Sequence, residues 1–337
     1  MRTRFLLLFV LLLFILSACQ PLPSTGGPAA SVVATIVAST LTANATLAVL
    51  PQPGPAASVL LVLTSTPSPT PTDAPPGSIP AQAAQIPQPA GEVTILLEGS
   101  DQRPGGQDFR TDTAVLVVLK PDGSVSLVSF PRDLWVYLPG KFMERINSAQ
   151  EYGGFALVQS TFQYNFGFTP QSYVLTNFNG FLSIINNLGG LDVQVGQNFS
   201  DARDGYPKGY TVHAGLVHMD SATALWYIRA RETTSDLDRL RRAQEVILAI
   251  GKKLLSLNAL TRIPQLFAGF RGAIVTDMTV QDVSSLLPLL QLVDPGKIQR
   301  YAISTAQVTS FFTSGGADVL LPRPDAIRQL LMQAMGN

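Results

Sequence analysis

The pattern of apolar and polar residues predicts three strands at the start of the charged part of the chain. Residues 93–97 (VTILL) and 114–120 (AVLVVLK) are almost wholly apolar, as in strands buried on both faces, whereas residues 125–130 alternate with a period of two. A Pro-Asp-Gly sequence at 121–123 separates the last two runs and is a strong turn signal. The pattern therefore predicts a first strand followed by a β-hairpin.

This hairpin is predicted to bring opposite charges to one edge of the sheet. Asp112 and Arg132 lie ten residues on either side of Asp122, the centre of the turn, so folding at the turn places them at the same edge. If the first strand runs antiparallel to the second, Asp101 at its C-terminal end reaches that edge too. Two carboxylates and an arginine thus converge on local grounds.

Two further arginines alternate later in the chain. Residues 225–231 (LWYIRAR) are predicted as a strand, and its period of two places Arg229 and Arg231 on the same face. Such arginines are most often part of a solvated face or of salt bridges, so this feature alone does not indicate a site.

A helix is predicted directly afterwards. Ser235 is expected to cap it, and an apolar stripe continues to residue 257. Arg239, Arg241 and Arg242 crowd the first two turns, where the helix dipole disfavours cations but attracts an anion such as phosphate.

Each charged feature also has an ordinary structural interpretation, as a turn residue, a cap or a charged surface. A site is favoured by the number of arginines that converge near paired carboxylates in a sparsely charged chain. Such a set suits Mg²⁺, which is held by one or two carboxylates plus substrate phosphates. Guanidinium groups suit the remaining phosphate oxygens. The chain contains no GxxxxGK[ST] loop and no GxSxG elbow.

Residues 1–19 are predicted as an export signal that ends in a lipid anchor. Two arginines precede an apolar run at 5–16, which is shorter than the ~20 residues of a membrane-spanning helix. The sequence LSAC at 16–19 resembles the lipobox of bacterial lipoproteins, which implies cleavage before Cys19 and lipidation of its thiol. An ordinary cleaved signal is the alternative. The lipoprotein is favoured because Cys19 is the only cysteine of the chain.

Residues 20–90 are predicted as a linker, because they hold 14 of the 25 prolines and a single charged residue, Asp73. Residues 31–50 also suit a marginal membrane segment, but their Ser, Thr and Asn content favours the linker. Residues 91–337 carry 43 of the 46 charged residues and are predicted to form one large α/β domain.

Composition excludes several classes of protein. With 46% apolar and 14% charged residues, the chain has enough apolar material for a packed core and does not have the composition of a disordered polymer. The formal net charge of zero argues against a nucleic-acid partner. One cysteine and two histidines leave no basis for an internal disulfide framework or a Cys- or His-rich metal site.

The order of eight motifs resembles the LytR-CpsA-Psr family of bacterial cell-envelope proteins over roughly residues 91–335. The matching segments are GSDQR (99–103), RTDTAVLV (110–117), VSFPRDLWVYLPG (128–140), RINSAQEYGG (145–154), NFNGFLSIINNLGGLDVQV (177–195), SATALWYIRAR (221–231), SDLDRLRRAQ (235–244) and GADVLLP (316–322).

This resemblance implies a fold, a reaction and a location. The fold is α/β, a mixed central sheet with an antiparallel hairpin, covered by helices in an α/β/α arrangement, with an apolar slot for a polyprenyl chain. The reaction is a Mg²⁺-dependent phosphotransfer that moves a glycopolymer from a polyprenyl-pyrophosphate carrier to peptidoglycan or another wall acceptor and releases polyprenyl phosphate. The location is the extracytoplasmic face of the cell membrane, here through a lipid anchor.

The resemblance also assigns roles to residues. Asp101 and Asp112 correspond to the magnesium-linked carboxylates. Arg132, Arg229, Arg231 and Arg239 correspond to catalytic, pyrophosphate-binding arginines. Further substrate contacts are implied for Arg103, Arg145, Arg242 and Gln244.

Three positions depart from the family's usual pattern. Ala243 stands where a glutamine is common, with Gln244 next to it, Arg145 replaces a lysine, and Glu98 replaces an apolar residue. Segments 155–168 and 178–188 are rich in large apolar residues and could line the slot. For any single residue in them, a place in the hydrophobic core is the more common role.

Two other functions use the same charges. With water as acceptor, the site would be that of a polyprenyl-pyrophosphate hydrolase. Without the metal, it would be that of an envelope module that binds lipid phosphates. Both carboxylates are present, which ranks the binding module lower. A role in transcriptional regulation finds no support in an exported chain without a basic DNA-binding face.

Overall fold

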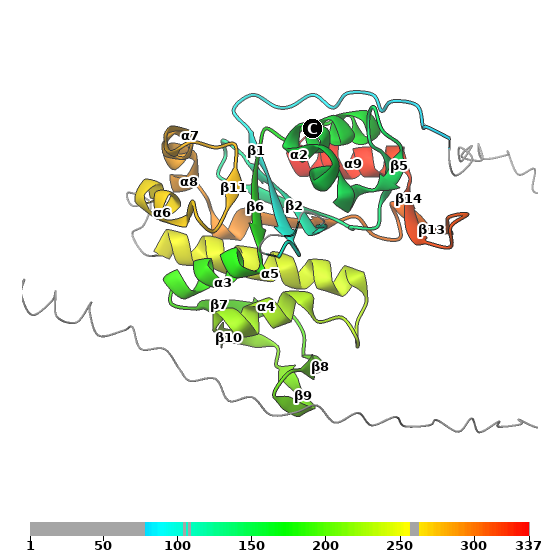
Figure 1. The fold of residues 1–337 in the computed structure, drawn as a ribbon. Coiled ribbons are helices and arrows are strands. Elements are labelled where there is room, and N and C mark those ends of the chain that lie inside the picture. Colours follow the sequence, from blue (N-terminus) through cyan, green and yellow to red (C-terminus); the bar gives the residue numbers. More distant parts are fainter. Residues whose placement is uncertain (1–77, 104–105, 107–108, 257–262, 337) are drawn as a thin grey trace, which may run out of the picture. The chain divides into compact units, whose positions relative to one another are not determined.

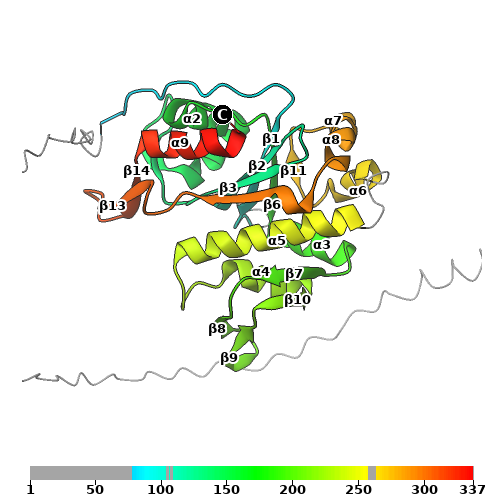
Figure 2. The same cartoon turned by 180° about the vertical axis from the view of Figure 1, so that it is seen from behind.

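The computed structural model describes residues 78–103, 106, 109–256 and 263–336. A six-stranded mixed sheet forms its centre (Figures 1 and 2). The strands, in order across the sheet, are β11 (Val275–Thr276), β6 (Ser172–Asn177), β1 (Val93–Ser100), β2 (Thr111–Leu119), β3 (Val125–Phe130) and β12 (Ile298–Ala302).

The pairing of the three central strands confirms the predicted hairpin and its orientation. β2 and β3 are antiparallel, with Ala114 opposite Phe130 and Leu119 opposite Val125 around the Pro-Asp-Gly turn. β1 is antiparallel to β2. The outer neighbours β6 and β12 run parallel to β1 and β3, so the sheet is mixed, as expected.

One face of the sheet is covered by α2 (Ala149–Phe166) and α9 (Pro324–Met335), which lie side by side in Figures 1 and 2. Phe130, Phe162 and Phe166 form the aromatic centre of this core. The apolar segment 155–168 therefore supplies core residues here, the more ordinary of the two roles expected for it.

The opposite face is covered by α5 (Asp236–Ser256), and a further layer lies beyond it (Figures 1 and 2). Buried Leu127 and Val115 of the sheet pack with the partly buried Ile247 and Leu248 of α5. The outer layer has its own core around Tyr227 and Ile185. Its elements are α3 (Phe178–Asn187), α4 (Ser221–Arg229), β7 (Leu191–Val195) and β10 (Gly215–Met219).

Ser235 caps α5 as predicted, because its hydroxyl accepts from the Asp238 amide at 3.3 Å. Short two-stranded ribbons and short helices complete the described chain. The ribbons are β4 (Trp135–Tyr137) with β5 (Met143–Arg145), β8 (Phe199–Arg203) with β9 (Tyr206–Val212), and β13 (Val308–Phe312) with β14 (Asp318–Pro322). The short helices are α6 (Ile263–Phe270), α7 (Val280–Ser285), α8 (Leu287–Gln291), η1 (Ile146–Ser148) and η3 (Pro295–Lys297).

The strand predicted at 225–231 is wrong, because this segment is the second half of helix α4 and the loop after it. Asp220 caps the helix by accepting from the Thr223 amide at 2.7 Å. Ala224 and Tyr227 are buried in the outer core, a spacing of three that suits a helix. The aromatic and β-branched residues favoured a strand, but the cap and this packing outweigh that local preference.

The packed domain also begins before the boundary expected at residue 91. The amide of Ala83 donates to the Tyr164 carbonyl at 2.8 Å, and the amide of Ile86 donates to the Gly167 carbonyl at 2.7 Å. Ile86 is buried in the core beside α2. Residues 78–90 are therefore an extended segment bound to the domain rather than free linker.

Within the described ranges, none of the helices is long and apolar enough to cross a membrane. The expected signal, Cys19 and most of the expected linker fall outside these ranges.

Candidate active site

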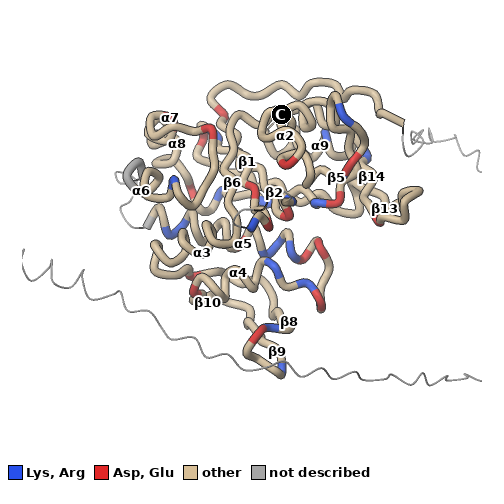
Figure 3. Tube along the Cα trace, in the orientation of Figure 1, with Lys and Arg blue, Asp and Glu red and all other residues tan. Residues whose placement is uncertain are grey.

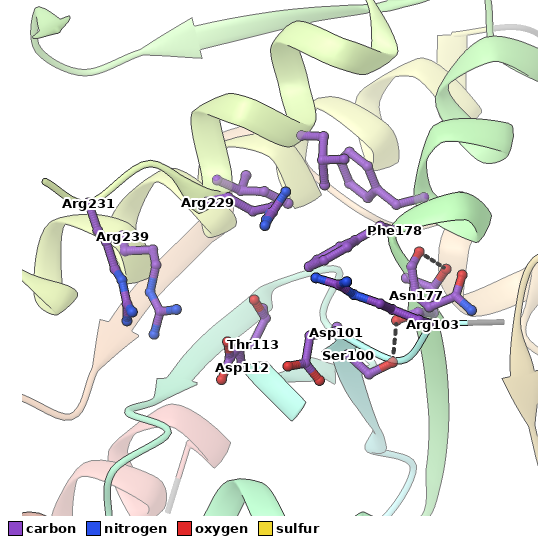
Figure 4. Close-up of a pocket in the computed structure, with 15 residues that line it drawn as sticks. Ser100, Asp101, Arg103, Asp112, Thr113, Asn177, Phe178, Arg229, Arg231 and Arg239 are labelled. Atoms are coloured by element: carbon purple, nitrogen blue, oxygen red, sulfur yellow. Dashed lines mark hydrogen bonds between the residues drawn. The ribbon is translucent and has the colours of Figure 1, made fainter. Parts of the chain in front are cut away.

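A cavity of about 240 Å³ lies where β1 and β6 end and β2 begins, below α3, α4 and the start of α5 (Figure 4). Charged segments gather around this part of the fold in Figure 3. The charged residues on its wall are Asp101, Arg103, Asp112, Arg229, Arg231 and Arg239. Six of the residues singled out from the sequence are therefore brought together.

A β-bulge turns Asp112 toward the cavity. Gly99 pairs with Thr113 and Ser100 pairs with Thr111, so Asp112 is the extra residue of β2 and has no partner on β1. Bulges of this kind re-aim a side chain beside an active site. Asp101 follows β1 directly, and its Oδ1 accepts from the Arg110 amide at 2.7 Å. The two carboxylates thus come from adjacent antiparallel strands.

Arg132 holds Asp112 from outside the cavity. Its Nη1 lies 3.2 Å from Oδ2 of Asp112, which confirms that the hairpin places these two residues together. Its Nε lies 3.3 Å from Asp133 and 3.6 Å from Asp236. Burial alone would lower the pKa of Arg132, but the three carboxylates hold it above its usual value. Arg132 is not among the residues that line the cavity, so in this structure its guanidinium pairs with carboxylates rather than facing a ligand.

Asn147 supports the same carboxylate from the other side. Its Nδ2 donates to Oδ1 of Asp112 at 3.3 Å, from the 3-10 helix that follows β5. The sequence motif contained this asparagine, but its role is clear only from the fold, because 35 residues separate it from Asp112.

Arg239 is a buried cation with an unused donor. Its side chain is 7% exposed, and its Nη2 pairs with Asp236 at 3.0 Å. Burial lowers the pKa of this guanidinium, Asp236 opposes the shift, and the nearby Arg132 adds to it. Its Nε is buried without a hydrogen-bond partner in the described part of the chain. Leaving a buried donor unpaired costs free energy, and an anion in the cavity would remove that cost.

Arg229 and Arg231 are not neutralised by the protein. Arg229 is the last residue of α4, and Arg231 follows two positions later. Neither forms an ion pair with any described residue; the guanidinium of Arg229 instead lies 4.1 Å from the ring centroid of Phe178. Because four arginines and two aspartates line the cavity, its charged end suits an anion.

Part of the cavity wall is apolar. Phe178 and Phe181 from α3 line it together with Leu225 and Ile228 from α4. Asn177 caps α3 at the cavity and accepts from the Gly180 amide at 2.9 Å, so the positive end of this helix dipole also lies at the wall. The cavity therefore offers cationic and apolar surfaces side by side.

Two residues expected to bind substrate are turned into the protein interior. Arg242 is fully buried and donates to the Tyr227 and Ala230 carbonyls and to Asp238. Gln244 donates to Ser129 Oγ at 2.8 Å and to the Tyr301 carbonyl at 2.7 Å, which ties α5 to the sheet. The expectation of substrate contacts is not met in this structure, because their donors are used by the fold.

Arg145 also lies away from the cavity. Its Nε is 3.0 Å from Asp133, and its Nη2 donates to the Asp318 carbonyl at 2.9 Å. It joins β5 to β14 and shares Asp133 with Arg132, so any influence on the site is indirect.

The donor set at the charged end fits Mg²⁺. Across the described ranges, no cluster of three or more His, Cys, Asp or Glu side chains comes together. Among the described residues, the acidic side chains on the cavity wall are Asp101 and Asp112. This number matches a Mg²⁺ ion whose coordination shell consists of one or two carboxylates, substrate oxygens and water. Oδ2 of Asp101 has no hydrogen-bond partner among the described residues and is open to such a cation.

Comparison with known proteins agrees with this fold. The LytR_cpsA_psr family profile matches residues 70–330, and the chain belongs to this family. Among curated relatives, the polyisoprenyl-teichoic acid–peptidoglycan teichoic acid transferase TagU of Oceanobacillus iheyensis is 31% identical over 204 residues, 58% of this chain and 62% of TagU. The regulatory protein MsrR of Staphylococcus aureus is 28% identical over 192 residues, 56% of this chain and 57% of MsrR. The matched part thus spans about three fifths of each relative.

Solved structures share the architecture. Bacillus subtilis TagV superposes with a TM-score of 0.61 at 23% identity, over 73% of this chain and 97% of TagV. TagT bound to LIIa-WTA superposes with a TM-score of 0.58 at 22% identity, over 77% of this chain and 97% of TagT. These similarities confirm the mixed α/β fold expected from the sequence.

Proposed function

We propose that the protein transfers a glycopolymer from a polyprenyl-pyrophosphate carrier to peptidoglycan or another wall acceptor and releases polyprenyl phosphate. The observation that carries this proposal is the composition of the cavity wall, which combines four arginines and two carboxylates with large apolar side chains. A prenyl pyrophosphate has the same two parts, an anionic head and an apolar tail. The name of the TagU relative, which describes teichoic acid transfer to peptidoglycan, supports the same reaction class.

The chemistry needs little covalent work by the protein. An acceptor hydroxyl oxygen bonds to the phosphorus that carries the glycopolymer, and the bond from that phosphorus to the bridging oxygen breaks. The electron pair leaves with polyprenyl phosphate, and the hydroxyl proton is released. Such a reaction depends on positioning and on neutralising charge at the phosphoryl oxygens.

The arginines of the cavity are assigned to that neutralisation. Arg229, Arg231 and Arg239 hold phosphate oxygens, and Arg239 gains the partner that its buried Nε lacks. Asp101 and Asp112 would hold Mg²⁺, which would offset part of the negative charge of the two phosphates. Arg132 and Asn147 keep Asp112 in place for this role.

Product analysis tests the proposal. The purified protein is incubated with a polyprenyl-pyrophosphate-linked glycopolymer and Mg²⁺, with and without peptidoglycan. Formation of polyprenyl phosphate and a phosphodiester-linked polymer only when peptidoglycan is present supports transfer. Equal release of polyprenyl phosphate in both samples would make the protein a hydrolase, and binding without turnover would make it a binding module; either contradicts the proposal. Chelation of Mg²⁺ is expected to abolish turnover.

Location is part of the same proposal. We propose that Cys19 carries a lipid and that the residues between it and the packed domain act as a spacer at the outer face of the membrane. Membrane fractionation of Cys19→Ala tests this assignment. Release of the variant from the membrane supports the anchor, and unchanged membrane association contradicts it.

A further inference from the structure

We propose that Phe178 is a positioning residue for Arg229. Its ring holds the Arg229 guanidinium in place for the pyrophosphate head, so binding of the head depends on a residue of the apolar wall. The inference rests on the proposed function, since it assumes a prenyl pyrophosphate in the cavity. Phe178 belongs to no charged cluster, and the sequence alone did not distinguish it from other core aromatics.

The ring and the guanidinium are in direct contact. Cζ of Arg229 lies 4.1 Å from the ring centroid of Phe178, well within the ~6 Å over which a cation is attracted to an aromatic face. Both residues line the cavity and both are labelled in Figure 4, where the two side chains lie close together. The contact therefore aims a cation at the space where the ligand is proposed to bind.

The backbone that carries the Phe178 ring is closely packed. Phe178 is the first residue of α3, directly after the capping Asn177. At Gly180, a Cβ would collide with the Ala273 carbonyl, so the first turn of α3 lies tightly against residue 273. Thr176, just before the cap, donates to the same carbonyl at 2.8 Å. The start of α3 is thus packed closely against this one carbonyl.

Arg229 has no comparable support of its own. Arg239 is anchored by Asp236 at 3.0 Å, whereas the guanidinium of Arg229 makes no ion pair or hydrogen bond with a described residue. An arginine loses rotamer freedom when it grips a ligand, and restriction beforehand lowers that cost. The Phe178 ring supplies this restriction without neutralising the charge, as an acidic partner would.

Phe178 also joins an arginine and the apolar side chains of the cavity wall. One neighbour is Arg229, and the other lining side chains of α3 and α4 are Phe181, Leu225 and Ile228. A simpler role is that of apolar wall alone. The two roles differ in one measurable respect: a wall residue affects any ligand with a prenyl tail, whereas a residue acting through Arg229 affects only ligands with the anionic head.

The test compares two probes that share a tail, farnesyl pyrophosphate and farnesol, bound to the full chain with Mg²⁺ present. Phe178→Leu is expected to weaken farnesyl pyrophosphate about threefold to tenfold and to leave farnesol almost unchanged. Phe178→Tyr keeps an aromatic face and is expected to bind like the parent. Phe181→Leu is the matched control, because it shortens the same wall, and it is expected to affect both probes alike.

A double-mutant cycle with Arg229→Gln isolates the coupling. In the Arg229→Gln background, Phe178→Leu is expected to cause little further loss of farnesyl pyrophosphate. Equal losses for both probes, or the same loss with and without Arg229, would overturn the inference while leaving the proposed function intact. If the parent protein shows no preference for farnesyl pyrophosphate over farnesol, the proposed function itself fails. Phe178→Met replaces the leucine variant if melting shows that the latter does not fold.

Discussion

Arg239 and Arg242 lie one turn apart on α5 and differ in how the protein uses their charge. Arg242 is 0% exposed, its guanidinium donates to two carbonyls and to Asp238, and its face lies 4.0 Å from the ring of Phe199. Arg239 has one acidic partner and a buried Nε without a partner in the described chain. The donors of Arg242 are all used within the protein, whereas Arg239 retains a donor for a ligand.

This difference separates a structural arginine from a binding arginine in a way that sequence spacing does not. Side chains three residues apart on a helix point only about 60° apart, so both arginines belong to one broad face. What distinguishes them is the chain that covers them: α4 and the loop after it close over Arg242, whereas Arg239 lies at the cavity. Satisfaction of hydrogen bonds is thus the better guide to function.

The largest expected effect is on stability at Arg242. Replacing Arg242 with Met removes the donors to the Tyr227 and Ala230 carbonyls and one partner of Asp238. Breaking such a buried ion pair is expected to lower the free energy of unfolding by about 3–5 kcal/mol. Urea denaturation measures this. Arg231→Gln, at an exposed arginine, is the control and is expected to change stability by less than about 0.5 kcal/mol. Equal stability of both variants would contradict the comparison.

Glu98 extends the comparison to an acid that is buried without a full set of partners. It is 5% exposed, its Oε2 lacks a hydrogen bond within the described chain, and burial raises its pKa from 4.5 to about 7, although Thr111 opposes the shift. The unfolded chain ionises near 4.5 and the folded one near 7, so this residue costs stability increasingly as pH rises between those values. The cost is complete above pH 7 and absent below pH 4.5.

Glu98→Gln is therefore expected to raise the free energy of unfolding at pH 8 by up to about 3 kcal/mol, with the gain disappearing near pH 4.5. Denaturation at both pH values measures this. Asp282→Asn is the control of opposite sign, because hydrogen bonds from Thr279 lower the pKa of Asp282, so the parent has the advantage at pH 8. A gain that is independent of pH would show that Glu98 is not protonated in the fold.

The arginines of the cavity are expected to affect binding more than folding. Replacing Arg229, Arg231 or Arg239 with Lys keeps the charge but loses the forked geometry. Each variant is expected to lose about tenfold to a hundredfold in affinity for farnesyl pyrophosphate or in rate, with little change in melting temperature. Arg323→Lys, at an arginine that donates to Thr309 away from the cavity, is the control. Variants that unfold yet bind normally would make the cluster structural.

Replacing the two carboxylates of the cavity tests their expected role in holding Mg²⁺. Asp101→Asn and Asp112→Asn are expected to reduce turnover and Mg²⁺ dependence while binding of polyprenyl phosphate largely survives. Activity measured over a Mg²⁺ titration, beside a lipid-phosphate binding assay, separates the two effects. Loss of binding with unchanged Mg²⁺ dependence would remove the metal role from this pair.

The last prediction concerns the stability contributed by the segment that precedes the predicted boundary. A protein truncated to begin at Gly91 loses the burial of Ile86 and two backbone hydrogen bonds to α2. Relative to one that begins at Ser78, it is expected to be less stable by about 1.5–3 kcal/mol yet still to fold cooperatively. Equal stability would show that residues 78–90 do not contribute to the packed domain.

The sequence was informative where structure is set locally. The turn at 121–123 fixed the register of the hairpin, and with it the meeting of Asp112 and Arg132. It failed where tertiary packing decides. Three features depend on contacts between separate elements rather than on a local pattern. They are the helix at Ser221–Arg229, the inward direction of Arg242 and Gln244, and the bulge that turns Asp112. For the same reason, the sequence did not show that Phe178 is the aromatic partner of Arg229.

The most direct test of the central claim is a crystal structure of the protein with Mg²⁺ and farnesyl pyrophosphate. The account predicts that the pyrophosphate lies between Asp101 and Asp112 on one side and Arg229, Arg231 and Arg239 on the other, with the first prenyl units against Phe181 and Leu225. A pyrophosphate bound elsewhere, such as in the groove near Lys120 and Lys297 at the opposite end of the sheet, with this cavity unchanged, would contradict it.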